Sequence, residues 1–276
     1  MSEQIGDLWR RASRLIGRLD ARHLLEHVGA CRHADLIAHP ERELRPAQLA
    51  QFNALLERRV AGEPLAYLLG TCEFYGLEFA VSPDVLIPRA DTEVLVDQAL
   101  VHARRLAAPR IVELGTGSGI VAIVLAKRLP SAAITAVDVS SAALLVAGEN
   151  AARHAAPIRF MHGSWYGPLA GERFDLIVAN PPYVAAGDPH LARDGLPFEP
   201  ALALSDGVVG GDGLGCIRAI VDGAPAHLAP GGWLLIEHGY NQAVETRQLL
   251  QGAGFSQISS WCDAAAIERV SGGCVP

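Results

Sequence analysis

The first seventy residues carry their apolar side chains at helical spacing. Apolar residues recur every three or four positions along residues 5–16, which predicts a first helix with one buried face. The pattern returns at residues 24–28, after an Asp20 that can cap the start of a second helix. A third helix is predicted over residues 46–62, with a proline in its first turn and a glycine at its end. The pattern indicates a small all-helical domain.

The pattern changes at residue 73, where strand-forming residues replace the helical spacing. Residues 73–81 read Glu-Phe-Tyr-Gly-Leu-Glu-Phe-Ala-Val, and the glycine in the middle predicts a β-hairpin. We therefore expect three parts along the chain. They are a helical domain over residues 1–72, a β-hairpin linker over residues 73–90 and a larger domain over residues 91–276.

From residue 91 onward, short apolar strands alternate with helices. A helix capped by Asp91 or Thr92 is expected to reach about residue 106, and another is expected over residues 120–129. Strands are predicted at residues 110–114, 133–137, 158–161, 174–179, 232–237, 256–261 and 267–271. Such alternation is typical of an α/β domain whose mostly parallel sheet is covered on both faces and binds ligands at the carboxyl ends of its strands.

The composition indicates a protein with a large folded core. Half of the 276 residues are hydrophobic and 19% are charged, which excludes a disordered or fibrous chain. The net charge is −7, and residues 1–70 carry ten arginines against nine acidic residues. Neither part of the chain has the strongly basic surface of sequence-independent nucleic-acid binding. We expect a protein or small-molecule partner and no direct contact with nucleic acid.

The cysteines and the hydropathy favour a cytoplasmic protein. The five cysteines lie far apart and form no CxxC pair, so we expect neither a disulfide framework nor a metal site. No basic cap precedes an apolar stretch at the start of the chain, and the longest apolar runs are too short to cross a bilayer. We therefore expect no association with a membrane.

A glycine-rich loop follows the first strand predicted in the larger domain. Gly115, Gly117 and Gly119 alternate with Thr116 and Ser118, so the backbone can turn tightly and a ligand can approach it closely. The loop joins a predicted strand to a predicted helix, as nucleotide-binding loops do. A tight turn that merely needs glycine is the alternative.

Two acidic residues accompany this loop. Glu113 stands at the end of the strand before it, and Asp138 ends the next strand, about twenty residues further on. A carboxylate in the position of Asp138 can accept hydrogen bonds from both hydroxyls of a ribose. The loop and the acids together predict a nucleotide or nucleoside site.

The spacing of the glycines favours S-adenosyl-L-methionine over NAD as the cofactor. The loop reads GxGxG, and Ile120 fills the place of the third glycine in the dinucleotide fingerprint GxGxxG. Glu113 would repel a phosphate, but it can bind the cationic amino group of a methionine moiety.

The strand at residues 174–179 leads into Asn180-Pro181-Pro182-Tyr183, a candidate clamp for an amide. An amide nitrogen is a poor nucleophile because its lone pair is delocalised into the carbonyl group. The Asn180 side-chain oxygen and the Pro181 carbonyl can accept its two N–H bonds and align the lone pair with the methyl group. The prolines fix the loop, and Tyr183 offers a flat face to the amide. A simple proline turn is the alternative.

These segments resemble the release factor glutamine methyltransferases, a family of class I S-adenosylmethionine-dependent methyltransferases also called HemK or PrmC. The resemblance covers nearly the whole chain. It rests on residues 74–82, 86–93, 113–119, 180–183, 198–200 and 237–239. The NPPY tetrapeptide also occurs in amino-group DNA methyltransferases, whereas the Ile-Pro-Arg-x-Asp-Thr-Glu segment at residues 87–93 is more specific.

The resemblance implies a seven-stranded, Rossmann-like methyltransferase domain that follows a helical domain contacting the substrate. It implies transfer of a methyl group to the side-chain nitrogen N5 of the glutamine in the Gly-Gly-Gln motif of peptide chain release factors. By match of motif, residues 115–119 and Asp138 would hold the cofactor and Trp165 would flank its adenine. Residues 180–183 would clamp the glutamine, with Asn180 next to the cofactor as well.

Some residues depart from the family pattern or have no settled role. Ser164 precedes Trp165 where family members often have an acid, and the tail after Val270 diverges and receives no role. Arg89 and Glu93 are candidates for the substrate entrance, and an interdomain ion pair is the alternative.

Three rival functions share parts of this pattern. A ribosomal-protein glutamine methyltransferase would have the same fold, cofactor and clamp, and would differ in the helical domain. A DNA adenine methyltransferase should carry a basic target-recognition region, which the sequence lacks. A catalytically silent binding protein would have no need for an intact glycine loop and clamp.

Overall fold

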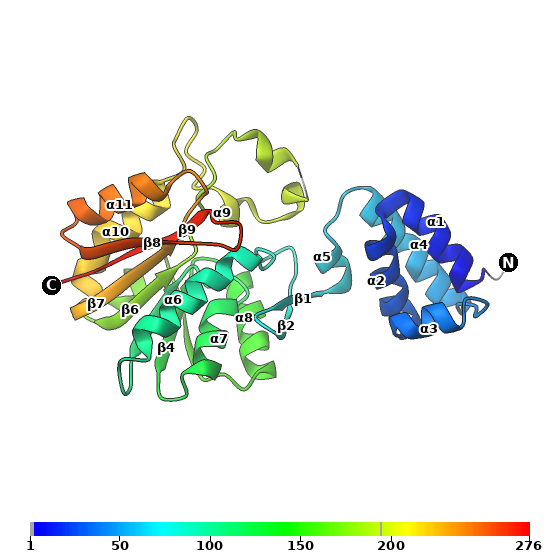
Figure 1. Ribbon diagram of the computed structural model, residues 1–276, viewed down its shortest axis with the longest axis horizontal. Helices are drawn as coiled ribbons and strands as arrows, with labels where there is room; N and C mark the ends of the chain where they lie inside the picture. Colours follow the sequence, from blue (N-terminus) through cyan, green and yellow to red (C-terminus); the bar gives the residue numbers. More distant parts are fainter. Residues whose placement is uncertain (1–2, 194) are drawn as a thin grey trace. The chain divides into compact units, whose positions relative to one another are not determined.

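The computed structural model describes residues 3–193 and 195–276, and the chain divides into two compact units (Figure 1). The first unit ends at Thr71 and the second comprises Cys72–Pro276. Each unit has hydrophobic clusters of its own, because the buried side chains of the helical cluster all lie between Ile5 and Leu68. No helix among the described residues is both long and apolar enough to span a membrane.

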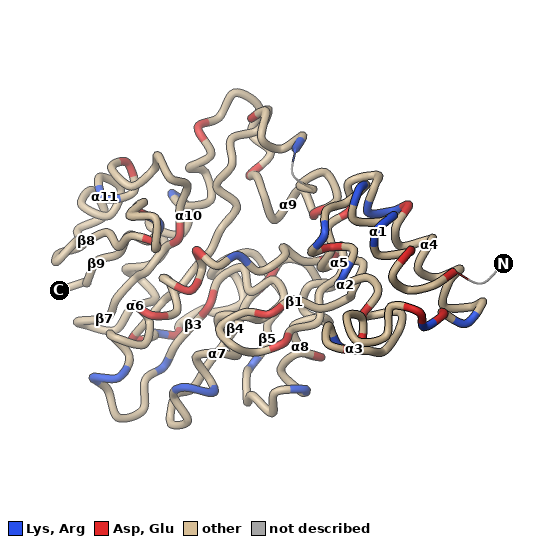
Figure 2. The backbone as a smooth tube through the Cα atoms, turned by 45° about the vertical axis from the view of Figure 1, so that its right-hand side comes forward, with Lys and Arg blue, Asp and Glu red and all other residues tan. Residues whose placement is uncertain are grey.

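The first unit is helical. Its helices are α1 (Ile5–Ile16), α2 (Arg18–Gly29), α3 (His33–Ala38), α4 (Pro46–Val60) and α5 (Leu65–Leu69). The predicted cap at Asp20 is wrong, because Gly17, with a φ of 84°, turns the chain so that α2 already begins at Arg18. Asp20 instead accepts a hydrogen bond from Arg59 Nε at 2.7 Å. Figure 2 shows basic and acidic positions interspersed along this unit.

A β-hairpin opens the second unit. Strands β1 (Thr71–Phe74) and β2 (Leu77–Ala80) are joined at Tyr75 and Gly76, whose φ angles of 52° and 73° fit the tight turn of a two-residue hairpin. Phe74 and Phe79 are buried in the core of the second unit. The hairpin therefore packs as part of that unit.

The second unit contains a seven-stranded, mostly parallel sheet with the order β5-β4-β3-β6-β7-β9-β8. The strands are β3 (Arg110–Leu114), β4 (Ala133–Asp138), β5 (Ile158–His162), β6 (Phe174–Ala179), β7 (Leu228–Glu237), β8 (Ser256–Cys262) and β9 (Glu268–Cys274). Among these seven strands β9 runs opposite to the rest, since it pairs antiparallel with both β7 and β8. The central strands β3, β4 and β6 thus bring their carboxyl ends to one edge.

Helices cover both faces of this sheet (Figure 1). Leu176 and Val178 of β6 belong to one core with α6 (Glu93–Ala103) and α7 (Ile120–Arg128), and α8 (Ser141–Arg153) packs beside α7. Ile177 and Ala179 face the other core, with α10 (Gly215–His227) and α11 (Ala243–Gly252). Side chains of a strand alternate between faces, so Asn180, which follows Ala179, continues toward the α6 side.

Short elements complete the unit. They are the 3₁₀ turns η1 (Ala90–Thr92), η2 (Gly167–Leu169), η3 (Pro189–Ala192) and η4 (Leu196–Phe198), and the short helix α9 (Ala201–Leu204). The predicted helix at residue 91 begins at Glu93, directly after η1.

The divergent tail is a strand of the sheet. Residues 268–274 form β9, which lies between β7 and β8 and pairs with both. A Cβ atom at Gly272 would come within 2.5 Å of the Leu234 carbonyl oxygen, so only glycine fits there. The tail to which the sequence assigned no role is therefore structural.

Candidate active site

A cavity of about 340 Å³ opens at the carboxyl ends of β3, β4 and β6. Its volume lies within the range of about 300–1,000 Å³ that is common for small-molecule sites. Of the residues predicted for the site, the cavity is lined by Arg89, Glu113, Gly115, Thr116, Gly117, Ser118, Asp138, Trp165, Asn180 and Pro182. The fold thus gathers residues from five separate sequence segments around one space.

The glycine loop has the backbone geometry that its sequence predicts. Gly115, Gly117 and Gly119 have φ angles of 76°, 55° and 83°, which residues other than glycine rarely adopt. A Cβ atom at Gly119 would lie 3.1 Å from Ile123 Cδ1 and 3.2 Å from Ala147 Cβ. Gly119 therefore also lets α7 start close to α8.

Asp138 ends β4 with its carboxylate beside the loop. Its Oδ2 accepts a hydrogen bond from Gly117 N at 2.8 Å, and its Oδ1 accepts one from Ser140 N at 2.8 Å. Each oxygen has a second lone pair, so the carboxylate can still accept bonds from two ligand hydroxyls. Asp138 thus fixes the loop and presents acceptors to the cavity.

Glu113 is buried at the end of β3. Its Oε2 accepts hydrogen bonds from Thr116 Oγ1 at 2.6 Å and from Ala122 N at 3.0 Å, so it ties the loop to the first turn of α7. Burial raises the pKa of Glu113 to about 8, and these two hydrogen bonds only partly oppose the effect. The carboxyl is therefore poised to ionise when a cation approaches it.

Trp165 lines the cavity and lies close to the first glycine of the loop. A Cβ atom at Gly115 would be 3.6 Å from Trp165 Cζ3, and Trp165 itself has a φ of 44°. A positive φ is uncommon for a bulky residue and often marks a functional site. Ser164 also lines the cavity.

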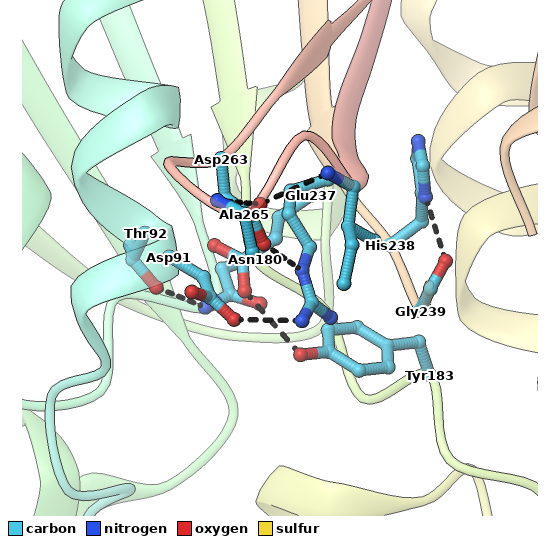
Figure 3. A network of polar contacts seen from close by, with 11 residues as sticks. Asp91, Thr92, Asn180, Tyr183, Glu237, His238, Gly239, Asp263 and Ala265 are labelled. Carbon is cyan, nitrogen blue, oxygen red and sulfur yellow. Dashed lines mark hydrogen bonds and ion pairs between the residues drawn. The ribbon is translucent and has the colours of Figure 1, made fainter. Parts of the chain in front are cut away.

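The NPPY loop is held from η1 and β7 (Figure 3). Asn180 Nδ2 donates a hydrogen bond to Thr92 Oγ1 at 3.2 Å, and the Asn180 Oδ1 takes no part in that bond. Tyr183 donates its hydroxyl proton to Glu237 Oε1 at 3.4 Å. Pro182 lines the cavity, Pro181 is buried, and neither Pro181 nor Tyr183 belongs to the described lining.

The two entrance candidates have different surroundings. Arg89 lines the cavity and forms an ion pair with the buried Glu199, which also accepts a hydrogen bond from Ile87 N at 2.9 Å. The pair lies within the second unit, so it ties the segment before α6 to the segment before α9. Glu93 is not brought to the cavity, because its Oε1 accepts a hydrogen bond from Tyr75 N at 3.1 Å and holds the hairpin turn.

Sequence reasoning missed the roles of Thr92, Glu199 and Glu237. Thr92 was expected only as a possible helix cap, yet its side chain makes no cap hydrogen bond and turns to Asn180. Glu199 and Glu237 stand in segments that resemble the family, and both are buried acids. A charged residue inside an apolar stretch was the available signal.

Comparison with known proteins places both units in one family. Residues 10–70 match the family described as the PrmC N-terminal domain, and residues 90–193 match the methyltransferase small domain. A release factor glutamine methyltransferase of Bordetella pertussis is 50% identical over 257 residues, which are 93% of this chain and 94% of that protein. One of Burkholderia pseudomallei is 49% identical over 94% of this chain and 92% of that protein.

Solved structures share the fold at low sequence identity. A methyltransferase from Pyrococcus furiosus superposes with a TM-score of 0.52 at 17% identity, covering 79% of this chain and 95% of that chain. A Thermus thermophilus 16S rRNA N2 G1207 methyltransferase, solved with AdoMet and guanosine, has a TM-score of 0.53 at 19% identity and covers 75% of this chain and 50% of that chain. At such identities the likeness concerns the fold alone.

Proposed function

The chain belongs to the family of release factor glutamine methyltransferases, and we propose that it methylates N5 of the glutamine in the Gly-Gly-Gln motif of peptide chain release factors. The observation that carries the proposed chemistry is the hydrogen bond from Asn180 Nδ2 to Thr92. With its nitrogen held there, the asparagine has its oxygen left for the N–H group of another amide.

The cavity suits S-adenosyl-L-methionine, which supplies an electrophilic methyl group on a sulfonium when it is bound. Asp138 would accept the ribose hydroxyls, and Glu113 would meet the amino group of the methionine moiety. Trp165 would flank the adenine, and the glycine loop from Gly115 to Gly119 would let the ligand approach its backbone, because Gly115 and Gly117 line the cavity without a side chain. Apart from Gly119, each residue in these contacts lines the cavity.

The clamp would raise the reactivity of the amide by orientation. Asn180 Oδ1 and the Pro181 carbonyl would accept the two N–H bonds of the glutamine, and its lone pair would then point at the methyl group. Tyr183, the proposed flat contact for the amide, is itself held by its bond to Glu237. No strong base has to remove a proton before methyl transfer.

Intact-mass analysis tests the proposal. The enzyme and S-adenosyl-L-methionine are incubated with an unmodified release factor, and separately with ribosomal proteins. We expect the release factor alone to gain the mass of one methyl group. If a ribosomal protein gained the methyl group and the release factor gained none, the result would support the rival function, a ribosomal-protein glutamine methyltransferase.

We further propose that the helical unit docks the release factor and that the reaction takes place in the cytoplasm. The match of residues 10–70 to the PrmC N-terminal domain supports the first part. The five cysteines are all free, as is usual in a reducing compartment. Among the described residues of this unit, five of the ten arginines are paired with its own acids, for example Arg58 with Glu63 and Arg59 with Asp20.

A truncated chain that starts at Cys72 should keep cofactor affinity and lose most activity on an intact release factor. The second unit has complete hydrophobic clusters of its own, so it should fold without the helices. Calorimetry with the cofactor and methylation assays check the two halves of this prediction. Full activity of the truncated chain on the intact protein would exclude a docking role.

Cofactor binding at pH 7 should release up to about one proton, because a carboxyl with a pKa of about 8 is mostly protonated at that pH. A cation beside Glu113 lowers its pKa and drives the proton off, so affinity should increase as the pH rises toward 8. Calorimetry in buffers of different ionisation enthalpy measures this release. The Glu113→Gln variant should release much less, and an unchanged release would place the amino group elsewhere.

A further inference from the structure

Glu237 is a buried acid beside the clamp whose function the cofactor and clamp contacts do not explain. It ends β7, the strand next to β6, and it is 1% exposed. Its Oε1 accepts the Tyr183 hydroxyl proton at 3.4 Å, and its Oε2 has no hydrogen-bond partner in the described part of the chain. Burying such a group without full pairing is costly, so a plain structural role would favour an apolar residue here.

The neighbouring charges do not neutralise Glu237 directly. Arg269 of β9 is bonded through Nη2 to Asp91 at 3.1 Å and through Nε to Asp263 at 2.8 Å. The guanidinium of Arg269 is therefore engaged by Asp91 and Asp263. Glu237 faces Asp91 and Thr92 from η1, Tyr183 from the loop after β6, and Arg269 from β9.

The hydrogen bonds around Glu237 have a direction. Asn180 Nδ2 donates to Thr92 Oγ1 at 3.2 Å, so the hydroxyl acts as the acceptor in that bond. The hydroxyl proton of Thr92 is then free to point at Glu237, which it stabilises in the ionised form together with Tyr183. An ionised carboxylate only accepts hydrogen bonds, and it therefore keeps both hydroxyl protons pointing toward itself.

We propose that ionised Glu237 is a positioning residue for Asn180. It sets the direction of the hydrogen bonds that run from Asn180 through Thr92, so that Asn180 presents its oxygen, and not its NH₂ group, to the substrate amide. The inference rests on the proposed amide methylation. A rotated Asn180 would place a donor opposite the N–H donors of the substrate and would abolish the clamp. Glu237 acts through Thr92 and Tyr183 and touches neither the cofactor nor the substrate.

The Glu237→Gln variant tests this role with almost no change in shape. A glutamine can donate to Thr92 Oγ1, after which the hydroxyl proton can turn to Asn180 and favour the wrong orientation. We expect kcat on the release factor to fall by about 10- to 100-fold, as misplacement of a reacting group does. The cofactor Kd should stay within about twofold. Glu268→Gln is the matched control, since Glu268 is a partly exposed carboxylate on β9 bonded to Arg247, and it should leave kcat unchanged.

The pH profile of kcat, measured at saturating cofactor and release factor, separates positioning from mere packing. Burial raises the pKa of Glu237 to about 7, so the ionised form and its activity are present above pH 7 and are lost as the pH falls through that value. We expect this fall in kcat at low pH in the wild type and in Glu268→Gln, and we expect it to be absent in Glu237→Gln.

A pair of variants at Thr92 provides an independent test in case the Glu237 variant does not fold. Thr92→Val removes the intermediate hydroxyl and should lower kcat by a similar factor, whereas Thr92→Ser keeps the hydroxyl and should restore most of it. Two results overturn the inference, provided that the wild type methylates the release factor. They are a normal kcat in a folded Glu237→Gln variant and equal activity of the two Thr92 variants. A wild type without any methylation of the release factor overturns the proposed function and the inference together.

Discussion

Replacing Asn180 with alanine is expected to lower turnover on the release factor by about 10²- to 10³-fold, the usual cost of one preorganised acceptor in an active site. The variant loses the oxygen that would orient the glutamine amide, while the cofactor contacts at Asp138 and Glu113 remain. Cofactor affinity should therefore change much less than kcat. Steady-state kinetics and calorimetry on the same preparation measure the two quantities.

Asn180→Asp is the sharper form of this test. An aspartate still accepts hydrogen bonds, but it adds a charge beside the sulfonium and loses the NH₂ group that anchors the side chain at Thr92. It should bind the cofactor at least as well as the wild type and methylate poorly, because ground-state binding does not align the amide. Near-normal turnover in both variants would mean that Asn180 only shapes the turn.

Replacing Asp138 with alanine should weaken S-adenosyl-L-methionine binding by about 10²-fold or more. Hydrogen bonds to a charged group contribute about 1.5–3 kcal/mol each, and two ribose hydroxyls would lose their acceptor. The Gly117 N–H would also lose its partner, which loosens the glycine loop. Isothermal calorimetry measures the change in Kd.

Asp222→Ala is a suitable control for Asp138→Ala. Asp222 is an exposed residue of α10 outside the lining of the cavity, so its removal takes away the same charge without touching the site. Its affinity should match that of the wild type. Unchanged affinity in a folded Asp138→Ala variant would remove Asp138 from the site.

Local pattern was enough to predict the central architecture. The predicted strands at residues 110–114 and 174–179 coincide with β3 and β6, because each is a short, mainly apolar run that ends directly before turn-forming residues, Gly115 after β3 and Asn180-Pro181 after β6. A parallel sheet then places the carboxyl ends of its strands together, so the glycine loop, Asp138 and Asn180 could be assigned to one site. In the structure, residues 115–118, Asp138 and Asn180 line one cavity.

The polar support of the clamp could not be predicted in the same way. Thr92, Asn180 and Glu237 are brought together only by the order of β6 and β7 and by the packing of α6. No spacing in the sequence encodes these contacts, since each partner is more than fifty residues from the next. The start of α2 was mispredicted for a local reason, because Gly17 turns the chain before Asp20.

Mapping the methyl group on the release factor tests the central claim most directly. The wild-type enzyme is incubated with S-adenosyl-L-methionine and an unmodified release factor, or one whose Gly-Gly-Gln glutamine is replaced by asparagine, and digested peptides are sequenced by mass spectrometry. We predict one methyl group on the side-chain nitrogen of that glutamine and none on the substituted protein. A methyl group at another residue, or equal methylation of both proteins, would contradict the account.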